Sequence, residues 1–254
     1  SQVWSDNYDR QLDDIFAVQD DITQSVVNEL RSRLLPAEAD AKAEAQKVIA
    51  EVQEATRGRS ENAEAFRFYL RGQFLRALLD RESAAQAVTC YESALALDPD
   101  YALAWAGLAR ALSDQIGQNW IPRDQGIARA KAAADKAIAL APDLAEGYIA
   151  RGWILRAWDW DWRGAEAAFE RALKLSPDNV LAMNAAATLF GNLGRLDDAI
   201  VIFRRAAGLD PLNVAVNRNL GLYCLAKGAF EEAAAALDAA LQLSAKGGLT
   251  HEAV

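Results

Sequence analysis

Residues that could act as nucleophiles, bases or metal ligands are few in this sequence of 254 amino acids. The single histidine, His251, stands near the C-terminal end, whereas a serine or cysteine nucleophile needs a histidine base oriented by a third group. The two cysteines, Cys90 and Cys224, lie far apart, and the short-spaced Cys/His clusters that bind zinc are absent. The sequence also lacks a phosphate-binding glycine-rich motif. We therefore expect no catalytic activity, no bound metal and no cofactor.

One aromatic cluster invites a ligand-binding interpretation. Aromatic rings can hold cations or sugars, and the sequence contains the pentapeptide WDWDW at residues 158–162. Packing explains it more simply: one or two of these indoles fill the top of a helical unit, and Asp161 stands near the start of the next helix, where an acidic residue is favourable. For Trp120 two interpretations stay open, a cover over neighbouring helices or an exposed contact.

Composition excludes several classes of partner. The net charge is −9, with 36 acidic and 27 basic residues and no basic run, which disfavours nucleic acid. No stretch is long and apolar enough to span a membrane, and no signal-peptide pattern opens the chain. Two cysteines in helical patterns fit a cytoplasmic protein with reduced thiols. Because the sequence begins at Ser1 without a methionine, we expect it to be a piece of a longer protein.

A repeated sequence motif recurs along most of the chain. Four prolines end similar apolar stretches, in the segments ALALDPD, AIALAPD, ALKLSPD and AAGLDPL. A proline directly after an apolar helical pattern is typical of a helix stop. In the last repeat, Leu220-Gly221 and Cys224 precede a turn at Gly228, and Ala233 follows in the next helix. This pattern resembles the tetratricopeptide repeat, which has a period of about 34 residues.

The resemblance implies an all-α fold, a right-handed superhelical α-solenoid of helix–turn–helix repeats preceded by N-terminal helices. We expect five repeats, at 65–101, 102–144, 145–179, 180–213 and 214–247. The first three carry insertions between their helices, the longest around Trp120. Residues 58–64 form a predicted linker, and 248–254 a tail or the start of a truncated further helix.

Amphipathic helices are predicted at 11–35 and 37–56, separated by Pro36. The phrase VWSDNYDRQLDDIFAVQDDI resembles the closing segment of a TolB-like domain, so we interpret 1–57 as the tail of such a domain with a linker helix. In bacteria that domain lies between tetratricopeptide repeats and an output module. The module is commonly a class III adenylate or guanylate cyclase or a winged-helix transcription regulator. The resemblance therefore implies a regulatory piece of a larger signalling protein.

The concave surface of such a solenoid takes peptides, and residues one step from the packing positions are expected to face it. These candidates are Tyr69, Gln73, Arg76, Arg110, Asp114, Trp153, Arg156, Asn184, Thr188 and Arg218. The Lys/Asn clamp with which some relatives hold chaperone C-termini is absent from the corresponding positions, which disfavours chaperone docking.

The sequence thus predicts a non-catalytic scaffold that binds a peptide or protein partner in the groove. The first alternative is a self-assembly module that dimerises through the N-terminal helix or the open solenoid ends. The second alternative is a small-molecule sensor that uses the tryptophan-rich turns.

Overall fold

The computed structural model describes residue 58 and residues 60–249. The helices predicted at 11–35 and 37–56 lie outside the described residues, as do 250–254 at the end of the predicted tail. The chain divides into two compact units, residues 1–104 and 105–254, and each is described by itself. The described residues form ten α-helices and one short π-helix, without a strand among them, which confirms the all-α prediction.

The first unit contains α3 (Ala63–Ala77) packed on α4 (Arg81–Leu97), followed by the start of α5 (Ala102–Gly117). Both α3 and α4 begin at a polar cap. Asn62 Oδ1 accepts hydrogen bonds from the backbone N–H groups of Glu64 and Ala65, at 3.0 and 3.1 Å. Asp80 Oδ1 accepts one from Ser83 N at 2.9 Å, and hydrogen bonding to Ser83 lowers the pKa of Asp80. Helix α3 therefore begins two residues earlier than expected, inside the segment predicted as a linker.

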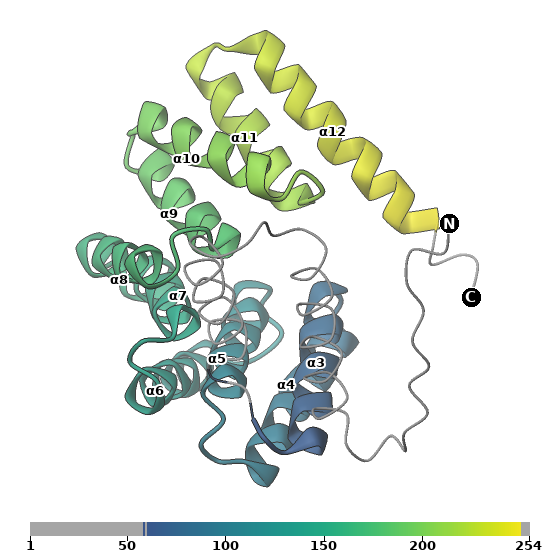
Figure 1. The fold of residues 1–254 in the computed structure, drawn as a ribbon, viewed down its shortest axis with the longest axis vertical. Helices are drawn as coiled ribbons and strands as arrows, with labels where there is room; N and C mark the ends of the chain where they lie inside the picture. The colour runs from purple at the N-terminus through teal and green to yellow at the C-terminus, as the bar shows by residue number, and fades with distance from the viewer. Residues whose placement is uncertain (1–57, 59, 250–254) are drawn as a thin grey trace, which may run out of the picture. The chain divides into compact units, whose positions relative to one another are not determined.

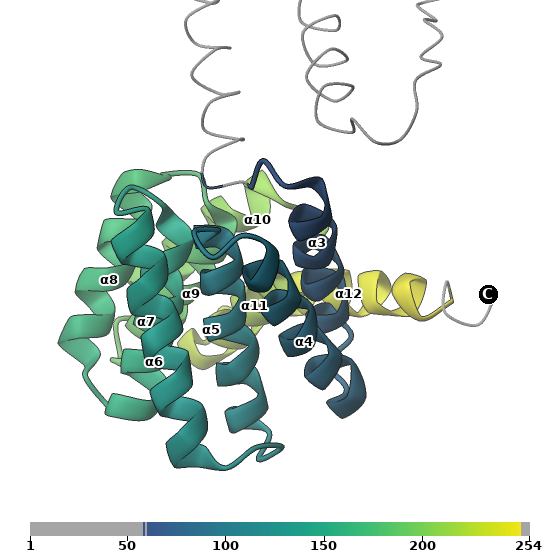
Figure 2. The same cartoon turned by 90° about the horizontal axis from the view of Figure 1, so that it is seen from below.

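The second unit continues α5 and adds seven α-helices in the order of the chain (Figure 1). They are α6 (Arg123–Leu140), α7 (Ala145–Ile154), α8 (Trp162–Leu175), α9 (Val180–Asn192), α10 (Leu196–Leu209), α11 (Val214–Lys227) and α12 (Phe230–Leu249). The π-helix η2 (Leu155–Asp159) prolongs α7. From α6 onward each α-helix packs against the next, so α6, α7 and α8 lie side by side in Figure 2.

The prolines mark helix ends, as the sequence predicts. The second helices α4, α6, α8 and α10 are capped by the residues directly before Pro99, Pro142, Pro177 and Pro211. At each cap the backbone leaves the helical conformation, because the proline ring disfavours that conformation in the residue before it. Asn179 and Asn213 then cap α9 and α11 by accepting hydrogen bonds from Ala182 N and Val216 N.

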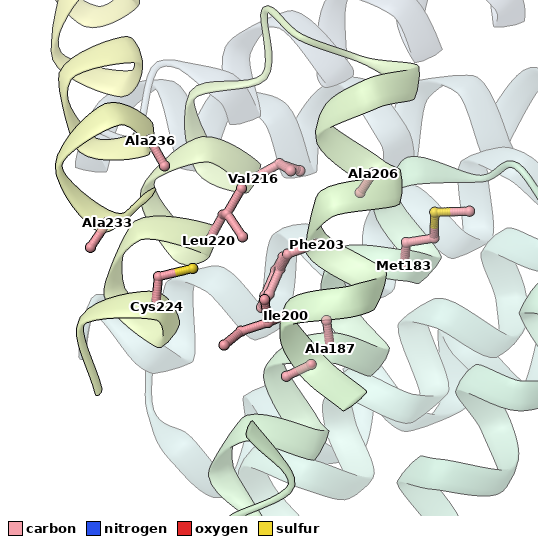
Figure 3. Packing of buried hydrophobic residues seen from close by; sticks show 11 residues of the cluster. Met183, Ala187, Ile200, Phe203, Ala206, Val216, Leu220, Cys224, Ala233 and Ala236 are labelled. Carbon is pink, nitrogen blue, oxygen red and sulfur yellow. The ribbon is translucent and has the colours of Figure 1, made fainter. Parts of the chain in front are cut away.

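Large side chains from the second helices fill the core between pairs. Phe203 of α10 is fully buried among Ala187 of α9 and Val216 and Leu220 of α11 (Figure 3). Burying one such side chain contributes about 1.5–3 kcal/mol. Alanines around it, among them Ala199 with 0% exposure, leave room for the ring. The sequence pattern of small and large residues thus corresponds to the packing between helices.

A left-handed residue lies in each turn between the two helices of a pair. These residues are Leu79, Asn119, Trp160, Gly194 and Gly228, with φ between 56° and 85°. Glycine adopts this conformation freely, whereas a side chain on an L-residue costs roughly 1–2 kcal/mol. The two regular repeats have glycine here, and the three repeats with insertions do not.

This difference predicts opposite effects of two substitutions in a urea unfolding experiment. Leu79 is 79% exposed, so Leu79→Gly removes the backbone strain and loses little packing. After allowing for the greater entropy of glycine in the unfolded chain, we expect the free energy of unfolding to rise by about 0.5–1 kcal/mol. In Gly194→Ala nothing lies within 4 Å of the added Cβ. We therefore expect the free energy of unfolding to fall by about 1 kcal/mol, and this loss reflects the left-handed backbone conformation alone. An unchanged midpoint for Gly194→Ala would contradict this account.

Candidate functional site

The first helices of three successive pairs contact one another, α7 with α9 and α9 with α11. A continuous set of polar and aromatic side chains crosses them. We call this set the α7–α9–α11 face and define it by Trp153, Arg156, Asn184, Thr188, Asn219 and Tyr223. All six are half-buried, so they are neither core residues nor freely solvated ones.

Hydrogen bonds fix the register of this face between α9 and α11. Asn219 Nδ2 donates to Asn184 Oδ1 at 2.9 Å, across 35 residues of sequence. The Tyr223 hydroxyl lies 3.2 Å from the carbonyl oxygen of Thr188 and 3.0 Å from Asn192 Oδ1. Thr188 Oγ1 in turn donates to the Asn184 carbonyl at 2.7 Å. The polar groups therefore form one network that holds neighbouring repeats together.

The ring of Tyr223 occupies a space that a glycine provides. It stacks on Phe203 with centroids 5.3 Å apart and planes at 19°. A Cβ added to Gly191 would stand 2.0 Å from Tyr223 Cε1, so only glycine permits this position of the ring. Burial raises the pKa of the Tyr223 hydroxyl, and the positive charge of Arg156 opposes that shift.

Arg156 and Trp153 form the other end of the face. The guanidinium carbon of Arg156 lies 4.2 Å from the centroid of the Trp153 ring, a cation–π geometry. Trp153 meets the buried ring of Phe169 edge-on, at 6.4 Å and 75°. Burial lowers the pKa of Arg156, and Tyr223 opposes the shift. Within the described part of the chain, Arg156 Nε and Trp153 Nε1 are buried and have no hydrogen-bond partner.

The π-helix that carries Arg156 is held by the tryptophan-rich turn. Trp158 Nε1 donates to Ser113 Oγ of α5 at 2.9 Å, and the Arg123 guanidinium lies 5.4 Å from the Trp158 ring. Asp161 Oδ1 accepts from Gly164 N at 2.9 Å and caps α8, which confirms the helix-start role predicted for Asp161. Trp160 is 65% exposed. The contacts of Trp158 support the packing interpretation of this cluster.

The structure brings together four of the predicted groove residues, Trp153, Arg156, Asn184 and Thr188, on the α7–α9–α11 face. Arg218 is exposed, and its side chain lies 3.3 Å from Asn219 Oδ1. Arg110, Asp114 and Trp120 are half-buried, on α5 or directly after it.

The first unit holds the remaining predicted residues. Gln73 is exposed and donates to the Tyr69 hydroxyl, and Arg76 is half-buried. Tyr69, predicted on the open surface, is instead 8% exposed. The reason is that its ring packs against Tyr91 and Tyr101, with centroids 6.0 and 5.2 Å away.

Asn219 and Tyr223 were not predicted. The signal that could have found them is their spacing, because each lies 35 residues after a predicted groove residue. A repeat places residues of equal helical position on the same face, so Asn184 and Thr188 implied their counterparts in the next repeat.

Within the described ranges no three His, Cys, Asp or Glu side chains gather as metal ligands would. Both thiols there, Cys90 and Cys224, are buried, and burial raises the pKa of each, so neither is primed as a nucleophile. None of the described helices combines the length and the apolar character needed to cross a membrane.

Helix pairs stacked in this way define an α-solenoid. The tetratricopeptide repeat model matches residues 73–115, 161–210 and 184–247, about half of the chain. The chain therefore belongs to the tetratricopeptide-repeat family.

Known proteins resemble the chain in sequence or in fold. It is 32% identical over 117 residues to putative adenylate cyclase 3 of Rhizobium meliloti (strain 1021). That match covers 46% of this chain and 18% of the cyclase, so the chain spans only a small part of its relative. A thermophilic tetratricopeptide-repeat protein of Thermus thermophilus has 20% identity and a TM-score of 0.59, covering 72% of this chain and 92% of its own. The type IV pilus biogenesis factor PilW has 20% identity and a TM-score of 0.52, covering 70% of this chain and 77% of its own.

Two glycine substitutions test the geometry of the site. Gly191→Ala is expected to expel the Tyr223 ring and to break its hydrogen bonds to α9, with a loss of about 1–3 kcal/mol on thermal unfolding. Gly208→Ala is the matched control, because nothing lies within 4 Å of its added Cβ and Gly208 lies within α10. Alanine there should stabilise the helix by about 0.5–1 kcal/mol. Equal effects of the two changes would contradict the placement of Tyr223.

Proposed function

We propose that this chain is a non-catalytic scaffold that binds a peptide or protein along the α7–α9–α11 face. Tetratricopeptide-repeat proteins generally mediate interactions between proteins, and family membership supports the same role here. The observation that carries the proposal is the half-buried network on that face. Its asparagine amides suit the N–H and C=O groups of a peptide backbone, and its aromatic rings and Arg156 are residue types enriched where proteins meet.

The likeness to a putative adenylate cyclase supports a regulatory context for this scaffold. In this proposal the chain is the sensory or regulatory part of a larger bacterial signalling protein located in the cytoplasm. Its output domain is a cyclase or a winged-helix regulator. Partner binding to the repeats then biases the activity of that domain. The residues of this chain position the partner and perform no step of the output reaction.

Peptide binding is tested by obstructing the face. Thr188→Arg places a long charged side chain between Asn184 and Tyr223, whereas Val201→Arg places one on α10, where Val201 is 62% exposed. Random decapeptides displayed on phage are selected against the chain, and the enriched peptides are titrated against both variants. We expect Thr188→Arg to weaken binding at least tenfold and Val201→Arg to leave it unchanged. Failure to enrich any peptide, or equal binding by both variants, would count against the proposal.

A second candidate function is self-association, which the last helix pair favours. The large apolar side chains most exposed on α11 and α12 are Leu222 at 49%, Leu225 at 49%, Phe230 at 68% and Leu241 at 67%. Exposed apolar surface at the end of a solenoid is where a further repeat or a second copy can pack. A dimerised output domain would gain from such an interface.

Light scattering coupled to size exclusion measures this directly. We expect the parent chain to migrate as a dimer and the double variant Phe230→Glu, Leu241→Glu to migrate as a monomer. The control is Val201→Glu, because this change also places a charge at an exposed apolar position, but on another helix. A monomeric parent chain at high concentration would remove this candidate.

A further inference from the structure

Arg156 differs from other arginines of the second unit in its surroundings. The side chains of Arg195, Arg204 and Arg205 are 45%, 54% and 58% exposed, yet each pairs with a carboxylate at 2.6 to 2.7 Å. The opposite combination occurs at Arg156, which is half-buried and whose Nε has no hydrogen-bond partner among the residues that the structure describes. Of these four cations, the most buried one is thus the one that forms no ion pair with a carboxylate among the described residues.

A half-buried cation whose Nε is buried without an acceptor is unfavourable, and a carboxylate is the group that compensates it best. Among the described residues no carboxylate forms an ion pair with Arg156. Burial raises the pKa of Tyr223, so its hydroxyl stays protonated and neutral at physiological pH. The Trp153 ring offsets part of the cost through the cation–π contact but offers no oxygen.

Trp153 adds a second N–H donor to the same place. Its indole Nε1 is buried and lacks an acceptor within the described ranges, and the Arg156 guanidinium lies over the ring that carries it. Buried donors in folded proteins are normally paired, so two unpaired donors beside one cation suit an oxygen acceptor that a bound partner supplies. Both stand at or beside a π-helix, an irregularity that is frequent at functional sites.

We propose that Arg156 and Trp153 form a subsite for a carboxylate, supplied by a glutamate or aspartate side chain of a peptide bound along the α7–α9–α11 face. This inference rests on the proposed function and adds the chemistry that the partner must carry. The Asn184–Asn219 pair, hydrogen-bonded at 2.9 Å, then lies along the same face to receive the peptide backbone. Arg156 thus selects acidic peptides over neutral ones.

The two unpaired donors are also the reporters of the test. The ¹⁵N resonances of the Arg156 Nε–H and Trp153 Nε1–H groups are followed while acetylated, amidated decapeptide pools are added to the full chain. One pool carries a central glutamate with random flanks, a second carries glutamine there, and a third carries phosphoserine. We expect the glutamate pool to shift both resonances at concentrations at least tenfold below those needed for the glutamine pool.

Variants assign that preference to Arg156. Arg156→Gln should abolish the difference between the pools at the Trp153 resonance, and Arg156→Lys, which keeps the charge but loses the planar fork, should retain part of it. Arg163→Gln on α8, next to the Asp161 cap and away from the unpaired donors in sequence, is the control and should leave the preference intact. Equal responses to the glutamate and glutamine pools would overturn the carboxylate subsite and leave the proposed scaffold function standing. A stronger response to phosphoserine would overturn it in favour of a phosphate site, and no response to any pool would overturn both proposals.

Discussion

The close approach of a small residue on one helix to a large side chain on its partner is the contact on which this fold depends. A Cβ on Gly72 would stand 3.0 Å from the Tyr91 ring, and one on Gly152 would stand 2.4 Å from Phe169. Each ring is at most 1% exposed, so the glycine is what permits its burial. The large side chain of the second helix packs against the glycine of the first helix in its own pair. The opposite side of that first helix therefore makes other contacts. The α7–α9–α11 face is a consequence of that arrangement.

Most of the fold could be predicted because the residues that end the helices and pack between them recur in a short-range sequence pattern. A proline after an apolar segment marks the helix end. A small residue such as Gly152 on one helix and a large residue such as Phe169 on the next identify two helices that pack together. Residues such as Tyr69 failed this reasoning for a physical reason. Its place on the helix matched the open surface, but Tyr91 and Tyr101 are large enough to reach and cover its ring.

The candidate site was less predictable, since its character depends on Arg156 having no carboxylate partner among the described residues. In the sequence Arg156 looks like Arg195, and only the structure shows that Arg195 has two carboxylates at 2.6 and 2.9 Å. The π-helix was equally hidden. Its Trp158 donates a hydrogen bond to Ser113 of α5, a contact across 45 residues that no local pattern encodes. Repeat spacing could have added Asn219 and Tyr223, because periodicity acts on surface positions as it does on core positions.

Charge sets a further constraint on how such a face would choose a partner. The chain carries a net charge of −9, so an acidic peptide approaches it against a repulsive field. That field is screened beyond about 8 Å at physiological ionic strength, whereas a half-buried cation acts at contact and is screened little. Selectivity then comes from short-range desolvation at Arg156 rather than from long-range attraction. A peptide with one well-placed carboxylate satisfies this constraint better than a highly acidic one, because each additional charge adds repulsion and Arg156 is the one cation among the six residues that define the face.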